Sequence, residues 1–351
     1  MKRSGSIQLA AAVAVALASP GCKTSEAPPG GGGAGKVTIN GSGATFQKAA
    51  QEIAIEAFAK VRKDITVNYA GGGSGKGRKE LADQVVDYAC TDAPYKAEEA
   101  ASVKGGAFFY IPNVLGAIAV SYHLGGVDKL QLSADTLAKI FQREIKQWDD
   151  PAILADNPGA KLPSAAIVVA RRADGSGTTE NFTRYLHEAG GGAWKLGSGS
   201  TVAWPGDTQA GNGNNGVAGI VKKTSGAIGY LDLSDAIENK LRYAAVKNQA
   251  GTYVTPDAAS VTAAAEGITP DDKLLFSALN GKGVAAYPLT AQSWCMVYEK
   301  QTDKAKGEAL SAWFKFLLTD GQKLLPEIDF APVPKALADK ALAQIEKIQV
   351  P

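Results

Sequence analysis

Histidine and cysteine are scarce in this sequence, which has 351 residues but only two His and three Cys. His123 and His187 stand far apart, and the sequence has no HExxH or CxxC pattern. Zinc sites take clustered His and Cys ligands, so a zinc enzyme or a zinc ribbon is not expected. We predict no cofactor, although an all-oxygen calcium or magnesium site stays open because it needs neither residue type.

Neither sign of charge dominates the sequence. It has 37 Lys and Arg against 35 Asp and Glu, and Lys2 and Arg3 at the N-terminus account for the excess. A neutral chain has no general electrostatic field that would hold a polyanion. We therefore expect no nucleic acid among its partners.

The sequence also lacks an apolar run of about 20 residues, which is the length that a membrane-spanning helix requires. The shorter apolar run Ile7–Ala18 follows Lys2 and Arg3 and ends in small residues. A basic start, a short apolar stretch and a small-residue exit are typical of a secretory signal peptide. We predict a signal peptide over residues 1–21 and an exported protein that does not span a membrane.

Cys22 directly follows the small residue Gly21, as at the processing site of a bacterial lipoprotein. Ser19 and Pro20 depart from the usual pattern of such sites. We predict lipidation of Cys22, of the palmitate-bearing lipoprotein kind, and a periplasmic or cell-surface location with Cys22 as the membrane anchor. Residues 22–36 would form a flexible linker, because Pro, Gly and small polar residues cannot build a core. The alternative is ordinary signal cleavage nearby, which leaves Cys22 as a free thiol.

Two further cysteines, Cys90 and Cys295, lie in apolar, strand-like surroundings. In an oxidising compartment such a pair can form a disulfide. As small buried apolar residues, the two would instead remain free thiols. The sequence leaves both interpretations open.

From Lys36 onward, strand-like and helical patterns alternate. Val37–Ile39 and Ile65–Tyr69 are strand-like, whereas Phe46–Val61 has apolar residues at helical spacing. Apolar stripes within Leu310–Leu317 and Leu337–Ile348 predict two more helices that pack on a core. Such alternation over the rest of the chain predicts an α/β fold.

Three segments rich in glycine and hydroxyl residues stand between a strand-like and a helical stretch. They occupy residues 41–46 (GSGATF), 71–75 (GGGSG) and 171–178 (RRADGSGT). The first turn of a helix exposes N–H groups and the positive end of the helix dipole, which favour an anion. One such segment alone is ordinary helix capping. Three of them, the last with Arg172, predict an oxyanion site.

A literal GxGxxG pattern, GNGNNG, occupies residues 211–216. In dinucleotide-binding folds this pattern directly follows a strand. Here it follows the polar stretch 206–210, where we expect no strand. A dinucleotide site is therefore not predicted.

Asp92 follows a strand-like stretch and stands two residues before Pro94. A carboxylate repels an anionic ligand unless the ligand carries a proton that the carboxylate can accept. Hydrogen phosphate carries such a proton and sulfate does not, so a carboxylate beside the oxyanion site would select phosphate. Taken alone, Asp92 would be interpreted as a helix-capping residue.

The sequence resembles the phosphate-binding component of the bacterial Pst phosphate ABC importers in seven ordered segments between about Thr38 and Val333: INGSGATF, NYAGGGSGKG, VDYACTDAP, IKQWDDPAI, RRADGSGTT, GSGSTVAWP and SGAIGYL. The resemblance implies a type II periplasmic-binding-protein fold, with two α/β domains, a two-strand hinge and a ligand cleft between them. Domain I would comprise residues 37–112 plus 286–351, and domain II residues 113–285.

The resemblance also implies site residues. Phosphate would be bound by the three helix starts, one acceptor and one cation, through Thr45, Phe46, Ser74, Asp92, Arg172, Ser176, Gly177 and Thr178. Asp174 would orient Arg172. Gln47 replaces a Pro that is common in relatives, and we expect this change to matter little.

The implied function is high-affinity binding of inorganic phosphate outside the cytoplasmic membrane and its delivery to an ABC transporter of two permease and two ATP-binding subunits. Binding of another oxyanion, or phosphate sensing without transport, remains an alternative. We expect no enzyme. Phosphoryl transfer or ester hydrolysis through Asp92 or Ser176 would need a metal cluster or an activated nucleophile, and neither is evident in the sequence.

Overall fold

The computed structural model describes residues 36–351, which form one unit by themselves. The expected signal peptide, Cys22 and the linker up to Gly35 lie outside the described residues. The strands are β1 (Val37–Gly43), β2 (Ile65–Gly71), β3 (Tyr88–Thr91), β4 (Phe108–Tyr122), β5 (Gln131–Leu132), β6 (Val168–Arg172), β7 (Gln209–Gly211), β8 (Ala227–Asp232), β9 (Arg242–Tyr243), β10 (Ala245–Lys247), β11 (Tyr253–Val254) and β12 (Thr290–Tyr298).

The helices alternate with these strands along the chain. They are α1 (Lys48–Val61), α2 (Ser74–Ala82), α3 (Ala97–Ala100), α4 (Ala134–Phe141), α5 (Pro151–Asp156), α6 (Gly177–Ala189), α7 (Gly213–Lys223), α8 (Leu233–Glu238), α9 (Ala258–Ala264), α10 (Lys304–Leu318), the 3-10 helix η1 (Asp320–Ile328) and α11 (Lys335–Ile345). The expected α/β fold is confirmed. Among the described residues, no helix has the length and apolarity to cross a membrane.

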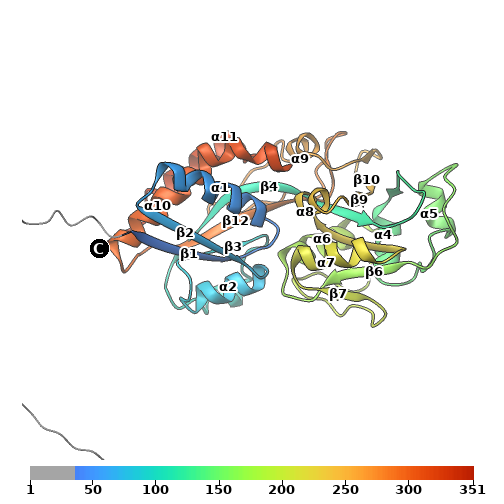
Figure 1. The fold of residues 1–351 in the computed structure, drawn as a ribbon, viewed down its shortest axis with the longest axis horizontal. Coiled ribbons are helices and arrows are strands. Elements are labelled where there is room, and N and C mark those ends of the chain that lie inside the picture. The colour runs from blue at the N-terminus through green and yellow to red at the C-terminus, as the bar shows by residue number, and fades with distance from the viewer. Residues whose placement is uncertain (1–35) are drawn as a thin grey trace, which may run out of the picture. The chain divides into compact units, whose positions relative to one another are not determined.

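One mixed sheet connects most of the strands, in the order β2-β1-β3-β12-β4-β8-β6-β7, with β9 also paired to β4. The pairs β1–β2, β1–β3, β6–β7 and β6–β8 are parallel. In Figure 1, β1, β2 and β3 lie with α1, α2, α10 and α11, and we call this group the first lobe. The second lobe comprises β6, β7 and β8 with α4, α6 and α7. The residue boundaries of the two expected domains stay a prediction.

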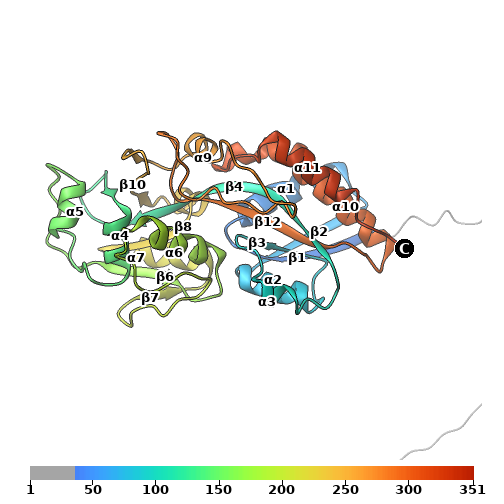
Figure 2. The ribbon, with the colours of Figure 1, turned by 180° about the vertical axis from the view of Figure 1, so that it is seen from behind.

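The strands β4 and β12 connect the lobes, as Figure 2 shows from behind. All nine residues of β12 are buried, and so is β4 from Tyr110 onward. Beyond its pairing with β12, β4 pairs antiparallel with β8, where Ile118 stands opposite Asp232. The β4–β12 register shifts between Ser293 and Trp294. Because β4 and β12 are buried and run through both lobes, they bring residues of one lobe beside residues of the other.

Aromatic packing in the core of the second lobe supports one of the predicted site segments. The rings of Phe182 and Tyr230 stack with centroids 4.3 Å apart, and both side chains are fully buried. Burial of one such ring stabilises a fold by roughly 2–3 kcal/mol. The Tyr230 hydroxyl accepts a hydrogen bond from the backbone N–H of Arg172 at 3.3 Å, so this core also holds the end of β6.

Cys90 and Cys295 stand opposite each other on β3 and β12. Their Sγ atoms are 3.2 Å apart, and both side chains are fully buried as free thiols. Of the two interpretations left open by the sequence, the structure has the pair of buried thiols.

One expectation about local structure was wrong. A strand, β7 (Gln209–Gly211), ends at the first glycine of the GNGNNG segment, and α7 begins within the segment at Gly213. Two of the three β7 residues are exposed, and three residues are too short to show an alternating apolar pattern. The segment is therefore a fourth glycine-rich helix start after a parallel strand.

Candidate functional site

The glycine-rich segments lie at helix starts that face one another across the two lobes. Strand β1 leads into α1, β2 into α2, β6 into α6 and β7 into α7. The backbone N–H of Gly75 in α2 donates to the carbonyl oxygen of Gly175 before α6, at 2.9 Å. The N–H of Asn214 in α7 donates to Thr45 Oγ1 before α1, at 3.3 Å. The lobes therefore touch at these helix starts.

Ser74 begins α2 and binds Asp92 twice. Its Oγ accepts the backbone N–H of Asp92 at 3.1 Å and lies 3.2 Å from Asp92 Oδ2, to which it can donate. Gly73 before it has φ 94°, a left-handed conformation that glycine adopts without strain. A side chain there would also lie 2.6 Å from the Gly175 carbonyl oxygen. Glycine at position 73 thus permits both the turn and the close approach of the lobes.

Asp92 is tied to both lobes and is only 1% exposed. Ser293 of β12 donates its hydroxyl to Asp92 Oδ1 at 2.6 Å. Asn181 of α6, in the second lobe, donates its side-chain amide to the Asp92 carbonyl oxygen at 2.8 Å. Both side chain and backbone of Asp92 are therefore held in place.

Burial raises the pKa of Asp92 to about 6, because the charged carboxylate is removed from water. Hydrogen bonds from Ser293 and Ser74 and the charge of Arg172 oppose this rise, whereas the charge of Asp232 adds to it. At neutral pH the carboxylate is ionised and can only accept hydrogen bonds.

Arg172 ends β6 and is buried with its guanidinium fixed by neighbours. Its Nε donates to Asp174 Oδ1 at 2.8 Å, and Nη2 pairs with Asp174 Oδ2. Its Nη1 donates to Asn214 Oδ1 at 2.8 Å and lies 3.5 Å from Thr178 Oγ1. Fork-like pairing of this kind fixes the plane of the guanidinium as well as its position.

Asp174 is the partner that the sequence suggested for Arg172. Burial works against its ionisation, but the hydrogen bonds and charge of Arg172, together with the N–H of Gly213 at 3.0 Å, prevail. The pKa of Asp174 is consequently held below its ordinary value. The pair therefore remains ionised at neutral pH.

The start of α6 lies directly against Asp92 and Ser74. Ser176 caps the helix by accepting the N–H of Thr179 at 3.0 Å, and Ser176 and Thr178 are buried. A Cβ on Gly177 would meet Ser74 Oγ and would lie 2.7 Å from Asp92 Cβ. The first turn of α6, whose N–H groups have no partner within the helix, is thus packed directly against Asp92 and Ser74.

The first segment contributes differently. Thr45 is half-buried and contacts Asn214, as described above. Phe46 is fully buried, and its ring packs edge-on against Phe330 with centroids 5.7 Å apart. Only the backbone of Phe46 can face a ligand. A cavity of about 350 Å³ opens beside this segment, between the lobes, lined by Thr45, Lys48, Gly71, Gly72, Asp174, Asn212, Gly213 and Asn215.

Three residues of this arrangement were missed from the sequence: Ser293, Asn181 and Asn214. Asn214 donates its amide to Asp232 Oδ2 at 2.7 Å and so connects Arg172 to the end of β8. It lies in GNGNNG, and a fourth glycine-rich helix start was the signal that could have found it. No local pattern distinguishes Ser293, which is 201 positions from Asp92.

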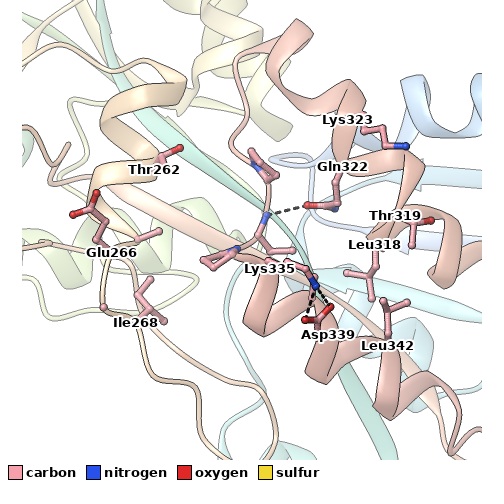
Figure 3. A pocket seen from close by; sticks show the side chains of 16 residues that line it. Thr262, Glu266, Ile268, Leu318, Thr319, Gln322, Lys323, Lys335, Asp339 and Leu342 are labelled. Carbon is pink, nitrogen blue, oxygen red and sulfur yellow. Dashed lines mark hydrogen bonds and ion pairs between the residues drawn. The ribbon is translucent and has the colours of Figure 1, made fainter.

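A second cavity, of about 840 Å³, lies away from these residues between α9, η1 and α11 (Figure 3). It is lined by Ile268, Leu318, Val333 and Leu342, among others, with the ion pair of Lys335 and Asp339 at its edge. None of the predicted site residues lines it.

Comparisons with known proteins agree with this geometry. The family model of the PBP superfamily domain matches residues 26–320. The phosphate-binding protein PstS of Xylella fastidiosa is 35% identical over 321 residues, which cover 89% of this chain and 86% of that protein. The PstS protein of Methanocaldococcus jannaschii is 37% identical over 82% of this chain and 80% of its own length.

Solved structures share the fold. A high affinity periplasmic phosphate-binding protein (PfluDING) bound with phosphate has a TM-score of 0.75 at 21% identity, covering 88% of this chain and 93% of its own. A phosphate-binding protein from Stenotrophomonas maltophilia has a TM-score of 0.72 at 19% identity, with the same coverage. By its family match and its identity to these relatives, the chain belongs to the PstS family of phosphate-binding proteins, within the PBP superfamily.

Proposed function

We propose that this protein binds inorganic phosphate between its two lobes, outside the cytoplasmic membrane, and delivers it to an ABC transporter for import. The observation that carries the proposal is the buried carboxyl group of Asp92, which residues at the helix starts of both lobes contact. Its relatives are named phosphate-binding proteins of the PstS type, which agrees with a phosphate ligand.

The proposed donors come from helix starts and from one cation. Backbone N–H groups and hydroxyls at the starts of α1, α2 and α6 would bind the phosphate oxygens, and Arg172 would supply the positive charge, held by Asp174. The complete proposed set is Thr45, Phe46, Ser74, Asp92, Arg172, Ser176, Gly177 and Thr178.

Asp92 would give the site its selectivity. The carboxylate accepts a hydrogen bond from a protonated oxygen of hydrogen phosphate or dihydrogen phosphate. Fully ionised sulfate has no such proton, so its oxygen would face the carboxylate as like charge in a buried site. A site whose buried polar group is left unpaired by the wrong ligand can discriminate by roughly 10⁴-fold or more.

Entry and release would require the lobes to separate. We propose two domains, residues 37–112 plus 286–351 and residues 113–285, which open and close about β4 and β12. The direct contacts between Gly75 and Gly175, and between Asn181 and Asp92, support this proposal as the contacts of a closed state.

Calorimetry tests the binding step on a chain of residues 24–351, which keeps every described residue, after removal of bound ligand. We expect tight binding of phosphate and negligible heat with sulfate at pH 7.5. Asp92→Asn should lose most of this preference, whereas Asp339→Asn, in an exposed ion pair far from the site, should match the parent. Absence of phosphate binding in a folded, ligand-free parent would overturn the proposal.

We further propose lipidation at Cys22 as the membrane anchor, with the ABC transporter of two permease and two ATP-binding subunits as partner. In the native host, Cys22→Ala should abolish incorporation of labelled palmitate and release the protein from the membrane fraction. A separate experiment tests the role in transport. Cells that carry Asp92→Asn in place of the parent should take up less phosphate when phosphate is scarce. Uptake that stays unchanged would point to sensing without transport.

A further inference from the structure

A chain of buried polar side chains extends from Asp92 through β12 to the residue before α1. Gln47, just before α1, is 0% exposed. Its Nε2 lies 2.6 Å from Ser293 Oγ, and Ser293 Oγ lies 2.6 Å from Asp92 Oδ1. Gln47 thus connects to the carboxylate through a single hydroxyl.

The direction of these hydrogen bonds follows from the carboxylate. Ionised Asp92 only accepts, so the single hydroxyl hydrogen of Ser293 points to Oδ1. Ser293 Oγ must then accept from residue 47, which fixes the amide nitrogen of Gln47 toward it. The other end of the amide agrees, because Gln47 Oε1 accepts from Asn113 Nδ2 at 2.7 Å and from Gln51 Nε2 at 2.9 Å.

The arrangement would be different if Asp92 were protonated. A carboxylic acid needs an acceptor for its hydrogen, and Ser293 Oγ could serve while turning its own hydrogen to the Thr91 carbonyl oxygen, 3.2 Å away. A hydroxyl oxygen has two lone pairs, so Gln47 can donate to Ser293 Oγ in both arrangements. When the Ser293 hydrogen points to Asp92 Oδ1, the donation from Gln47 strengthens the hydrogen bond to the carboxylate, since chains of hydrogen bonds polarise one another.

We propose that Gln47 is a positioning residue of the phosphate site, which acts through Ser293 to keep Asp92 ionised and ready to accept a proton from the ligand. The inference rests on the proposed phosphate function. It gives a specific role to a residue whose difference from its relatives was expected to matter little.

Several titratable or charged groups lie near Asp92 from the surrounding elements: Arg172 at the end of β6, Asp232 at the end of β8, Cys90 on β3 and Tyr69 on β2. Arg172 favours the ionised carboxylate, and Asp232 disfavours it. All four remain when Gln47 is replaced by a neutral residue. A change in the pH profile of such a variant therefore reports the loss of the hydrogen bonds of Gln47, and comparison with a Ser293 variant assigns the change to the bond between the two residues.

The test compares Gln47→Met, Ser293→Ala and the double variant with the parent, by phosphate and sulfate calorimetry between pH 5 and pH 8.5. Gln344→Met is the matched control, because it also removes a buried amide. Gln344 lies on α11, and its side-chain amide donates to the Tyr110 carbonyl oxygen at 3.0 Å. The titration of phosphate itself is common to every variant and cancels in the comparison.

We expect Gln47→Met to move the pH at which phosphate binding is lost upward by about one unit, equivalent to a tenfold loss of affinity near that pH. Its preference for phosphate over sulfate should fall, since protonated Asp92 can donate to sulfate. Ser293→Ala should give a larger shift, and the double variant should equal Ser293→Ala, because Gln47 acts only through Ser293. Gln344→Met should follow the parent.

A folded Gln47→Met with the pH profile and sulfate preference of the parent would overturn the inference and leave the proposed function intact. Failure of the parent to bind phosphate would instead overturn the proposed function. If Gln47→Met does not fold, Gln47→Asn provides the same comparison, because its shorter side chain keeps an amide but withdraws it from Ser293. Its shift should have the same sign.

Discussion

Gly177, the first residue of α6, lies so close to Asp92 that a Cβ at position 177 would be 2.7 Å from the Asp92 Cβ. The two residues belong to different lobes, and a helix start meets a buried carboxylate at this contact. The dipole of α6 favours the ionised carboxylate. The N–H groups in the first turn of α6 also favour an anionic ligand that carries a proton for Asp92. The carboxylate and the ligand therefore both depend on the close approach that glycine at position 177 permits.

Gly177→Ala tests whether this contact is needed for ligand binding. The added methyl group overpacks the contact at a cost of about 1–3 kcal/mol, so phosphate affinity should fall at least about fivefold. Gly219→Ala is the control, because it adds the same group in α7, where a Cβ would meet nothing within 4 Å. Calorimetry on both variants measures the difference. Equal affinity of Gly177→Ala and the parent would mean that the bound state does not use this close approach.

Asp92→Asn should stabilise the ligand-free protein at neutral pH. The pKa of Asp92 is about 6 in the folded protein against an ordinary value of 3.8, so the folded state holds the proton more tightly. The free energy of unfolding is therefore highest when the pH is below the pKa of Asp92 in the unfolded chain. It falls as the pH rises through about 6, by about 3 kcal/mol for a pKa shift of this size. Thermal unfolding at pH 7.5 should favour the variant, and at pH 4 the advantage should largely vanish. An advantage of the same size at both pH values would contradict this account of Asp92.

Arg172→Met should both abolish phosphate binding and destabilise the fold. The substitution leaves Asp174 and Asn214 without their guanidinium partner, and loss of one member of a buried ion pair costs about 3–5 kcal/mol. The sequence offers a matched control in Arg62→Met, because Arg62 pairs with Asp64 through the same two-residue spacing but at the surface. An exposed pair contributes about 1 kcal/mol or less. Chemical denaturation measures the free energy of unfolding that each variant loses relative to the parent. Equal losses in the two variants would refute the prediction.

The thiols of Cys90 and Cys295 should resist alkylation in the folded protein. Burial raises the pKa of Cys90, and the thiolate is the reactive form. After unfolding without a reductant, both residues should become alkylated, which mass spectrometry of the chain from residue 24 measures. If neither residue reacted after unfolding, the pair would be a disulfide in this chain.

Local signals explain what could be predicted from the sequence. The segments that contain Ser74, Arg172 and Gly177 each place glycine, a hydroxyl and a helix start within a few consecutive residues, so one reading of the chain finds them. Asp92 follows an apolar strand, but on its own it would be interpreted as a helix-capping residue, and only the resemblance to the phosphate-binding family assigned it to the site. The structure brings Ser74, Asp92 and Gly177 into contact, as a shared site requires.

What could not be predicted depends on contacts between distant parts of the chain. Ser293 sits in an apolar strand and looks like any serine until β12 pairs with β3 and places it against Asp92. Gln47 was judged by the residue that relatives have there, whereas its role depends on Asn113 and Ser293, which are far from it in the sequence. β7 was missed because three residues give no period to recognise.

The late position of β12 in the sequence also determines when this protein can finish folding. β12 pairs with both β3 and β4, yet it is made only after nearly all of the second lobe. Until then, β3 and β4 each have an unpaired edge, which is a hazard for aggregation. Asp92 likewise has no Ser293 beside it during that interval. Completion of the sheet and completion of the carboxylate's surroundings are thus the same event in folding, because both wait for β12.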